Sequence, residues 1–438
     1  MIRNRIRFLV FILLGFAGKS NAQSPSFCST NRFTDVALFD SSDIVMDTGL
    51  VYGISRNYFS GLNDTLRMNI FYPGMNTDTM NARPFILLIH GGAFISGGLH
   101  DMDYQCMAFA RRGFVTATIS YRLGWNCSGT DFLSICLLCG SFDALLKTAT
   151  YQAAQDGRAA MRYIDANHST YRIDPDNYFI GGTSAGSITA MHAAFWDQQE
   201  ADEFCPWASG QVGMLDTAGN ALPDNFHIRG VIDNCGAVSK DSVVLNNGDI
   251  PVISFHDEGD CIVPNQYGQV ISCLCQSFYW VAGSSALHGK LAANGICASM
   301  NLVPLSINHC SFPEYELVNR ASCFIRSVLC DSCQSSFNNT PYVLQHCSSS
   351  IGTGDLGPLY GIHLYPNPAA ENVFMEGLQA RLTYELELFD LAGRKIAGSQ
   401  FNGTNGKVFE TDLFPGGLYI LKIICAGQMR YFKLAIKK

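Results

Sequence analysis

Between residues 84 and 345, short apolar runs alternate with longer stretches that carry a helical pattern. The apolar runs have the length and side chains of buried strands, and they cover residues 84–90, 114–121, 177–182, 228–236 and 250–256. Strands that alternate with crossover helices predict a mostly parallel sheet covered by those helices. A sixth run, residues 302–308, contains Pro304, which has no N–H to donate, so we expect an edge strand there.

The neighbouring segments fit the same α/β architecture. Residues 24–83 predict leading strands, because apolar and polar side chains alternate there. Within residues 151–177, an apolar stripe of helical spacing contains Ala154, Met161 and Ile164. The chain therefore predicts one large α/β domain before residue 348.

The first 22 residues have the composition of a secretory signal peptide. Arg3, Arg5 and Arg7 precede an apolar run over residues 8–18, and small residues follow it. The apolar run is too short for a comfortable membrane span, so we expect no transmembrane anchor. This pattern predicts an exported protein that is secreted or held at the cell surface.

The charge balance excludes two classes of partner. Removal of residues 1–22 takes away three arginines and one lysine, which leaves 25 basic and 37 acidic residues and a net charge of −12. A surface of this sign disfavours nucleic acid and anionic membranes. Charged residues are only 15% and hydrophobic residues 47% of the chain, which is typical of a globular protein.

All 17 cysteines follow the signal segment, and in an exported protein most of them are expected to pair. The count is odd, so one cysteine stays unpaired or bridges to another chain. Cys330 and Cys333 have the spacing of a zinc or redox pair, but no second pair matches them, which favours disulfides. We expect no metal site.

The last part of the chain has a different pattern. Residues 348–361 are rich in serine and glycine, which predicts a linker. Residues 362–438 lose the helical period and consist of short alternating strands joined by turns. They predict a separate β-sandwich domain.

A candidate nucleophile lies in residues 179–187, FIGGTSAGS. Ser184 follows an apolar strand and precedes a helical run of small residues, which is the strand–turn–helix context of a nucleophile elbow. Gly182 and Gly186 leave room for a tight turn and a close approach of helix and strand. The alternative is a glycine-rich turn with an incidental serine.

A second motif supplies candidate oxyanion donors. The strand at residues 84–90 runs into Gly91 and Gly92, whose backbone N–H groups can face a developing oxyanion. Ala185, directly after the serine, can supply a further N–H group. His90 is expected to hold this loop rather than to act as a base.

Five motifs between residues 60 and 330 resemble, in this order, the carboxylesterase and lipase branch of the α/β-hydrolase superfamily: HGGAF, SYRLGW, AAQDGRAAMRYI, DPDNYFIGGTSAGS and HDEGDCIVP. The resemblance implies an α/β-hydrolase fold over residues 23–347. It also implies a triad of Ser184, Asp260 and His309 in the chain order of that family.

The sequence departs from the family pattern in two places. Asp257 stands where many relatives have glycine, which makes it a rival to Asp260 as the acid. Ser187 replaces the commoner second glycine of the elbow. Asp233, after an earlier strand, is a more remote alternative acid.

Three aromatic residues are candidates for the substrate pocket, with a core position as the alternative: Phe94, Trp125 and Phe312. The insertion at residues 125–147 is rich in cysteine and apolar side chains. It predicts either a disulfide-pinned flap over the site or a surface loop stapled to the core.

One disulfide is expected from the proposed triad. Cys261 follows Asp260, and Cys310 follows His309. If Asp260 and His309 are hydrogen-bonded, a Cys261–Cys310 bridge would join the two loops and limit drift of the imidazole.

The C-terminal segment resembles the sorting domain of type IX secretion cargo in LYPNPAAENVFME, ELELFDLAGRKI and LFPGGLYILKI. The resemblance implies export through the periplasm and outer membrane by the type IX machinery, with later removal of the domain in many cases. A small carbohydrate-binding module is the alternative.

Together these features predict a secreted serine esterase that forms an acyl-enzyme and needs no cofactor. The expected substrates are external small or polymeric esters, such as acylated or feruloylated polysaccharides, lipids or polyesters. Two alternatives are a serine peptidase of the same fold and a non-catalytic binding protein on a hydrolase fold.

Overall fold

The computed structural model describes residues 27–125, 142–245, 248–273, 278–341 and 347, followed by most of residues 362–438. The chain divides into two compact units, Met1–Ser348 and Ser349–Lys438. The predicted signal peptide, the linker at residues 348–361 and residues 126–141 of the predicted flap lie outside the described residues.

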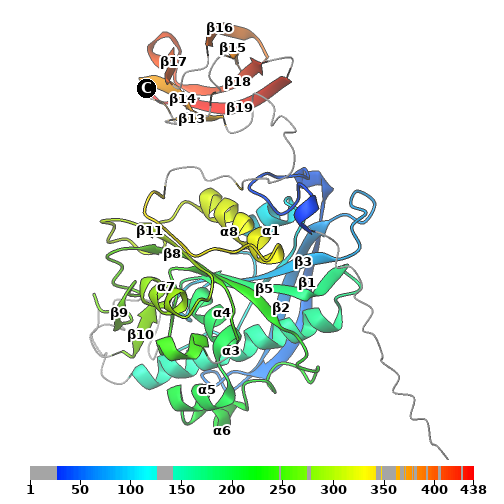
Figure 1. The fold of residues 1–438 in the computed structure, drawn as a ribbon, viewed down its shortest axis with the longest axis vertical. Helices are drawn as coiled ribbons and strands as arrows, with labels where there is room; N and C mark the ends of the chain where they lie inside the picture. Colours follow the sequence, from blue (N-terminus) through cyan, green and yellow to red (C-terminus); the bar gives the residue numbers. More distant parts are fainter. Residues whose placement is uncertain are drawn as a thin grey trace, which may run out of the picture. The chain divides into compact units, whose positions relative to one another are not determined.

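The first unit is built on a nine-stranded sheet (Figure 1). In spatial order its strands are β1 (Ile44–Arg56), β2 (Asn63–Pro73), β4 (Val115–Ile119), β3 (Arg83–Ile89), β5 (Ile173–Thr183), β6 (Ile228–Asn234), β8 (Val252–Asp257), β11 (Ala298–Val303) and β12 (Ser336–Asn338). The first two pairings are antiparallel and all later ones are parallel, which confirms the predicted mostly parallel sheet.

Helices cover both faces of this sheet (Figure 1). One face packs against α3 (Asp143–Ala166), α4 (Ala185–Phe195) and α7 (Ser284–Ala293), and the other packs against α1 (Asp103–Ala110) and α8 (Glu314–Leu329). Strand β3 serves both cores, because Phe85, Leu87 and Ile89 join the first while Ile86 and Leu88 join the second. This two-sided burial explains why the strand is apolar throughout.

Smaller elements complete the first unit. Strands β7 (Ala237–Val238), β10 (Trp280–Gly283) and β9 (Tyr267–Gln269) form a three-stranded antiparallel sheet. Two short helices, α5 (Gln198–Phe204) and α6 (Ala208–Val212), follow α4 along the chain. None of the helices in the described parts of the chain is long and apolar enough to cross a bilayer.

The edge strand predicted at residues 302–308 is wrong. Strand β11 ends at Val303, directly before Pro304, and it pairs with β8 on one side and β12 on the other. Proline therefore ends the strand instead of marking a sheet edge. The residues after it form the loop that carries His309.

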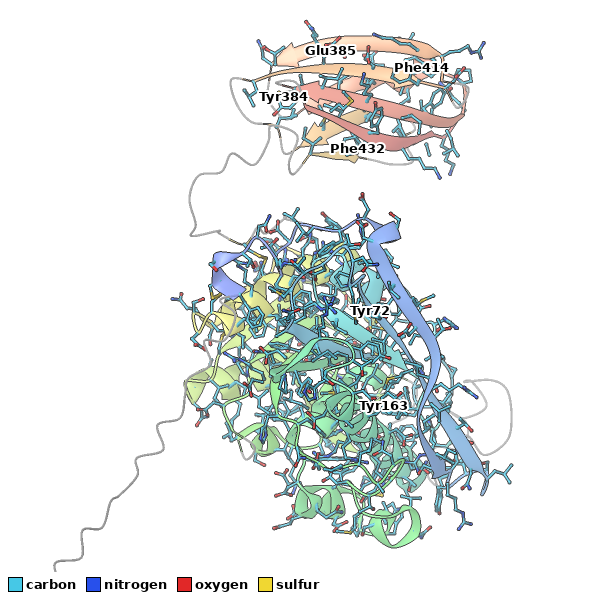
Figure 2. The ribbon with its side chains drawn as sticks, turned by 90° about the vertical axis from the view of Figure 1, so that its right-hand side faces the viewer. Tyr72, Tyr163, Tyr384, Glu385, Phe414 and Phe432 are labelled. Carbon is cyan, nitrogen blue, oxygen red and sulfur yellow. A yellow bond between two sulfur atoms is a disulfide. The ribbon has the colours of Figure 1, made fainter. Side chains whose placement is uncertain are left out.

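The second unit contains two antiparallel sheets. One has the order β13 (His363–Tyr365), β14 (Asn372–Glu376) and β17 (Gly406–Glu410), and the other β16 (Lys395–Asn402), β15 (Thr383–Phe389), β18 (Gly417–Cys425) and β19 (Gln428–Ile436). Their inward side chains share one core, in which Tyr384 alternates with the outward Glu385 (both labelled in Figure 2). The β-rich C-terminal domain predicted from the sequence is confirmed.

Candidate active site

Ser184 lies on a sharp turn between β5 and α4. Its backbone has φ 57° and ψ −121°, which few residues other than glycine adopt. A Cβ at Gly186 would lie 2.0 Å from the Ile89 carbonyl oxygen, and one at Gly182 would lie 2.4 Å from the Gly186 carbonyl carbon. Both glycines are therefore required for the helix to approach the sheet closely enough to raise this turn.

His309 connects the other two candidate residues. Its Nε2 lies 2.7 Å from Ser184 Oγ, and its Nδ1 lies 2.6 Å from Asp260 Oδ2. The imidazole is 24% exposed, whereas the Asp260 side chain is fully buried. The structure thus brings Ser184, His309 and Asp260 together in one hydrogen-bonded series.

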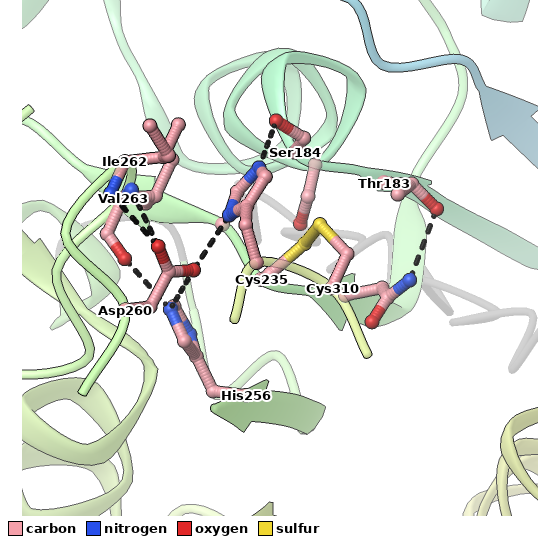
Figure 3. The surroundings of a disulfide bond; sticks show 12 residues. Thr183, Ser184, Cys235, His256, Asp260, Ile262, Val263 and Cys310 are labelled. Atoms are coloured by element: carbon pink, nitrogen blue, oxygen red, sulfur yellow. Dashed lines mark hydrogen bonds and ion pairs between the residues drawn. A yellow bond between two sulfur atoms is a disulfide. The ribbon is translucent and has the colours of Figure 1, made fainter. Parts of the chain in front are cut away.

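Both carboxylate oxygens of Asp260 have polar contacts (Figure 3). Its Oδ1 accepts the backbone N–H groups of Ile262, at 2.8 Å, and Val263, at 3.2 Å. Burial raises the pKa of Asp260, but hydrogen bonds and charge from His256 and His309 outweigh burial and lower this pKa to about 2. An ionised Asp260 can orient the imidazole and stabilise its protonated form.

The two alternative acids, Asp257 and Asp233, make hydrogen bonds to residues other than His309. Asp257 accepts hydrogen bonds from the backbone N–H and the hydroxyl of Ser311, so it anchors the loop after His309. Asp233 accepts a 2.6 Å hydrogen bond from Ser187 and does not contact His309. Ser187, the departure from the glycine pattern, therefore has a buried partner.

The predicted oxyanion donors lie beside Ser184. A Cβ at Gly91 would lie 3.3 Å from Ser184 Cβ, so this loop packs directly against the elbow. Among the described residues, the N–H groups of Gly91, Gly92 and Ala185 have no hydrogen-bond acceptor. Gly92 has φ +110°, a conformation that favours glycine.

His90 supports the same loop. Its Nδ1 lies 2.7 Å from the Gly91 carbonyl oxygen, and its ring stacks on Tyr121. The Tyr121 hydroxyl in turn donates to the His90 carbonyl oxygen at 3.0 Å. Burial lowers the pKa of His90, which favours a neutral ring.

A small apolar pocket opens beside Ser184. Its volume is about 30 Å³, and Phe94, Leu146, Ile188 and Tyr279 are among the side chains that line it. These four side chains are at most 6% exposed, so the surrounding core restricts how far the pocket can widen.

Only one of the three predicted pocket aromatics lines this pocket. Phe94 does, but Trp125 is completely buried against Phe142 and Phe278 and donates its indole N–H to the Ala93 carbonyl oxygen. Phe312 packs on Phe255 in the core under the other sheet face. Trp125 and Phe312 thus lie in core positions, which were considered as the alternative for them.

The predicted Cys261–Cys310 disulfide is also wrong. Cys310 pairs with Cys235 at the end of β6 (Figure 3), and Cys261 pairs with Cys273. Consecutive side chains point in different directions, so residues next to a hydrogen-bonded pair need not face each other. The loop of His309 is nevertheless fixed by a bridge, but to β6 instead of to the Asp260 loop.

Among the residues that the structure describes, the first unit has three further disulfides: Cys28–Cys330, Cys297–Cys333 and Cys323–Cys347. Two clusters of possible metal ligands occur in the described part of the chain, namely Cys235, His309 and Cys310, and Asp35, Cys323 and Cys347. In both clusters the cysteines are paired as disulfides and offer no thiolate to a metal.

Two family models match separate parts of the chain. The sequence model of the Carboxylesterase family matches residues 28–202, which include Ser184, Gly91 and Gly92. The match ends before Asp260 and His309, so their assignment depends on the geometry given above. A second model, the Secretion system C-terminal sorting domain, matches residues 363–437, which lie in the second unit.

Individual relatives match this chain over short segments. The para-nitrobenzyl esterase of Bacillus subtilis (strain 168) is 33% identical over 133 residues, which cover 30% of this chain and 24% of that protein. The neuroligin-like protein glit-1 of Caenorhabditis elegans is 31% identical over 126 residues, covering 29% of this chain and 15% of the relative. The chain thus spans less than a quarter of the length of either relative.

A solved structure, esterase B from Lactobacillus Rhamnosis (HN001), superimposes with a TM-score of 0.42 and 18% sequence identity. The superposition covers 67% of this chain and 88% of that one.

Removal of the Cys235–Cys310 bridge is expected to destabilise the first unit. The double variant Cys235→Ala/Cys310→Ala should lose about 2–4 kcal/mol of unfolding free energy in urea titrations, because the bridge closes a long loop. The control Cys261→Ala/Cys273→Ala should lose less, since its sequence separation is 12 and not 75. Peptide mapping that paired Cys261 with Cys310 would contradict this disulfide assignment.

Proposed function

We propose that the protein is a serine carboxylic-ester hydrolase with Ser184 as nucleophile, His309 as base and Asp260 as the orienting acid. The observation that carries this proposal is the position of His309, whose two ring nitrogens lie 2.7 Å from Ser184 Oγ and 2.6 Å from Asp260 Oδ2. A serine hydroxyl needs such a base, because it is a weak nucleophile at neutral pH.

The reaction follows from these positions. As Ser184 Oγ attacks the ester carbonyl carbon, its proton passes to His309 Nε2 and negative charge develops on the carbonyl oxygen. The N–H groups of Gly91, Gly92 and Ala185 are free to bind that oxygen. Cleavage of the carbon–oxygen bond releases the alcohol with the proton from His309 and leaves an acyl group on Ser184. His309 then activates a water molecule, which releases the acid and restores the serine.

The pocket beside Ser184 supports a preference for short acyl groups. The pocket is narrow and its walls are buried core side chains, so a short acyl group should fit there better than a long chain. Among external esters, acetylated polysaccharides agree with this size better than feruloylated ones or long-chain lipids. We further propose that the sorting domain delivers the enzyme through the type IX machinery to the cell surface or beyond.

Replacement of the nucleophile tests the enzymatic assignment. The wild-type protein should hydrolyse p-nitrophenyl acetate, and Ser184→Ala should lower kcat at least about a thousandfold, because nucleophile and base act as one unit. Ser209→Ala on α6 is the matched control and should keep the wild-type rate. A chromogenic dipeptide amide cleaved as fast as the ester would favour the peptidase alternative, and failure of the wild-type protein to cleave esters would contradict the proposal.

The acyl preference can be measured with a series of p-nitrophenyl esters. The wild-type kcat/KM should fall at least about tenfold from acetate to octanoate, because the pocket cannot take the added methylenes. Ile188→Ala, one helical turn after Ser184, should reduce that ratio by widening the pocket. Leu291→Ala, a buried truncation on α7 away from the lining, should leave the ratio unchanged. Equal rates for all chain lengths in the wild-type protein would refute the preference.

A further inference from the structure

A series of buried polar side chains runs behind the candidate triad. Ser187 on α4 donates to Asp233 Oδ1 at 2.6 Å, and Ser284 at the start of α7 donates to Asp233 Oδ2 at 2.6 Å. His256 Nδ1 on β8 lies 2.6 Å from the same Ser284 hydroxyl oxygen. All four side chains are buried, with residue exposures of 0% to 1%. Polar groups at such depth are costly unless their hydrogen bonds are satisfied.

The series ends at Asp260 (Figure 3). His256 Nε2 lies 2.9 Å from the Val263 carbonyl oxygen and 3.4 Å from Asp260 Oδ2. Asp260 Oδ2 is the same oxygen that faces His309 Nδ1 at 2.6 Å. A single carboxylate oxygen is thus contacted by both imidazoles.

The hydrogen atoms in this series can be counted. The Val263 carbonyl oxygen can only accept, so His256 Nε2 carries a hydrogen. Asp233 accepts hydrogen bonds from two hydroxyls and one backbone N–H, which suits a carboxylate. With Asp233 as a carboxylate, the single hydroxyl hydrogen of Ser284 is donated to it, and the 2.6 Å contact with His256 then needs a second hydrogen on Nδ1. An imidazole that donates from both nitrogens is the positively charged form. Asp233, which accepts from Ser187, Ser284 and the Gly236 N–H, balances that charge as a carboxylate.

We propose that His256 is a positively charged positioning residue, anchored by Asp233 through Ser284, that holds Asp260 in the orientation His309 requires. This inference rests on the proposed function for its catalytic consequence. Asp260 Oδ1 is fixed by two backbone N–H groups, and Oδ2 is contacted by His256 as well as by His309. Rotation of the carboxylate would break contacts on both oxygens, so the imidazole meets an acceptor in one defined place.

The charges also suit the reaction. At rest, the carboxylates of Asp233 and Asp260 and the cation of His256 sum to a single negative charge. When His309 takes the proton from Ser184, the group of four side chains becomes neutral. The buried site therefore carries little net charge at the stage when the imidazolium forms, which is favourable in a poorly solvated interior.

Two substitutions of His256 test its contact with Ser284 and its contact with Asp260 separately. In His256→Asn the amide nitrogen lies near the former Nδ1, which keeps the contact with Ser284 but removes the donor toward Asp260. In His256→Gln the amide nitrogen lies near the former Nε2 and restores that donor. We expect kcat for p-nitrophenyl acetate to fall between about tenfold and a hundredfold in His256→Asn, with little change in KM, and to recover to within about threefold in His256→Gln.

The matched control is His192→Asn. His192 is another fully buried histidine, whose Nε2 accepts the Ser239 N–H at 2.9 Å and whose ring stacks on Trp196, with no contact to the triad. His192→Asn should lower the melting temperature and leave kcat unchanged below the unfolding transition. Equal kcat losses in His192→Asn and His256→Asn, or a wild-type kcat in His256→Asn, would overturn the proposal.

A measurement without turnover separates this inference from the proposed function. In protein labelled with ¹⁵N-histidine, one buried imidazole should show hydrogen on both nitrogens at neutral pH, and its signals should vanish in His256→Gln. A single protonated nitrogen on His256 would overturn the proposal whatever the esterase assays give. Conversely, a wild-type ester rate in Ser184→Ala would refute the proposed function and leave the protonation result intact.

Discussion

The close contact between α4 and the central sheet is the constraint on which the candidate site depends. Gly186 has no side chain, so its Cα approaches the Ile89 carbonyl oxygen within a distance that any Cβ would forbid. Ser184 makes the sharp turn from β5 into this helix in a positive-φ conformation. The Gly91–Gly92 loop, which follows β3, packs against Ser184.

The remaining groups arrive on loops that follow neighbouring parallel strands. Asp260 follows β8 and His309 follows β11, and these strands pair directly. Parallel strands end at the same edge of a sheet, so residues 49 positions apart in the chain meet within hydrogen-bond distance. Side chains behind them satisfy the buried polar atoms: Asp257 holds the loop after His309, and His256 contacts Asp260.

Sequence reasoning recovered what depends on local pattern. The strands at residues 84–90 and 250–256 follow from their apolar runs, and the elbow follows from glycines at fixed offsets from Ser184. The predictions failed where a contact depends on the direction in which a side chain points. Cys310 pairs with Cys235 because the loop turns its side chain toward β6, which spacing along the chain does not reveal. His256 stood in the same motif as Asp260, but its contact becomes evident only once β8 and α7 are placed side by side.

In the proposed mechanism, Ser184 becomes acylated during ester hydrolysis. Mass spectrometry of peptides from protein incubated with a short-chain alkyl phosphonate ester tests it, because such a reagent forms a stable bond to an activated serine. If Ser184 is the nucleophile and His309 its base, one phosphonate per chain should be attached to the peptide that contains Ser184. Ser184 should not be labelled in His309→Ala. Attachment at another residue, or equal labelling of Ser184 in His309→Ala, would contradict it.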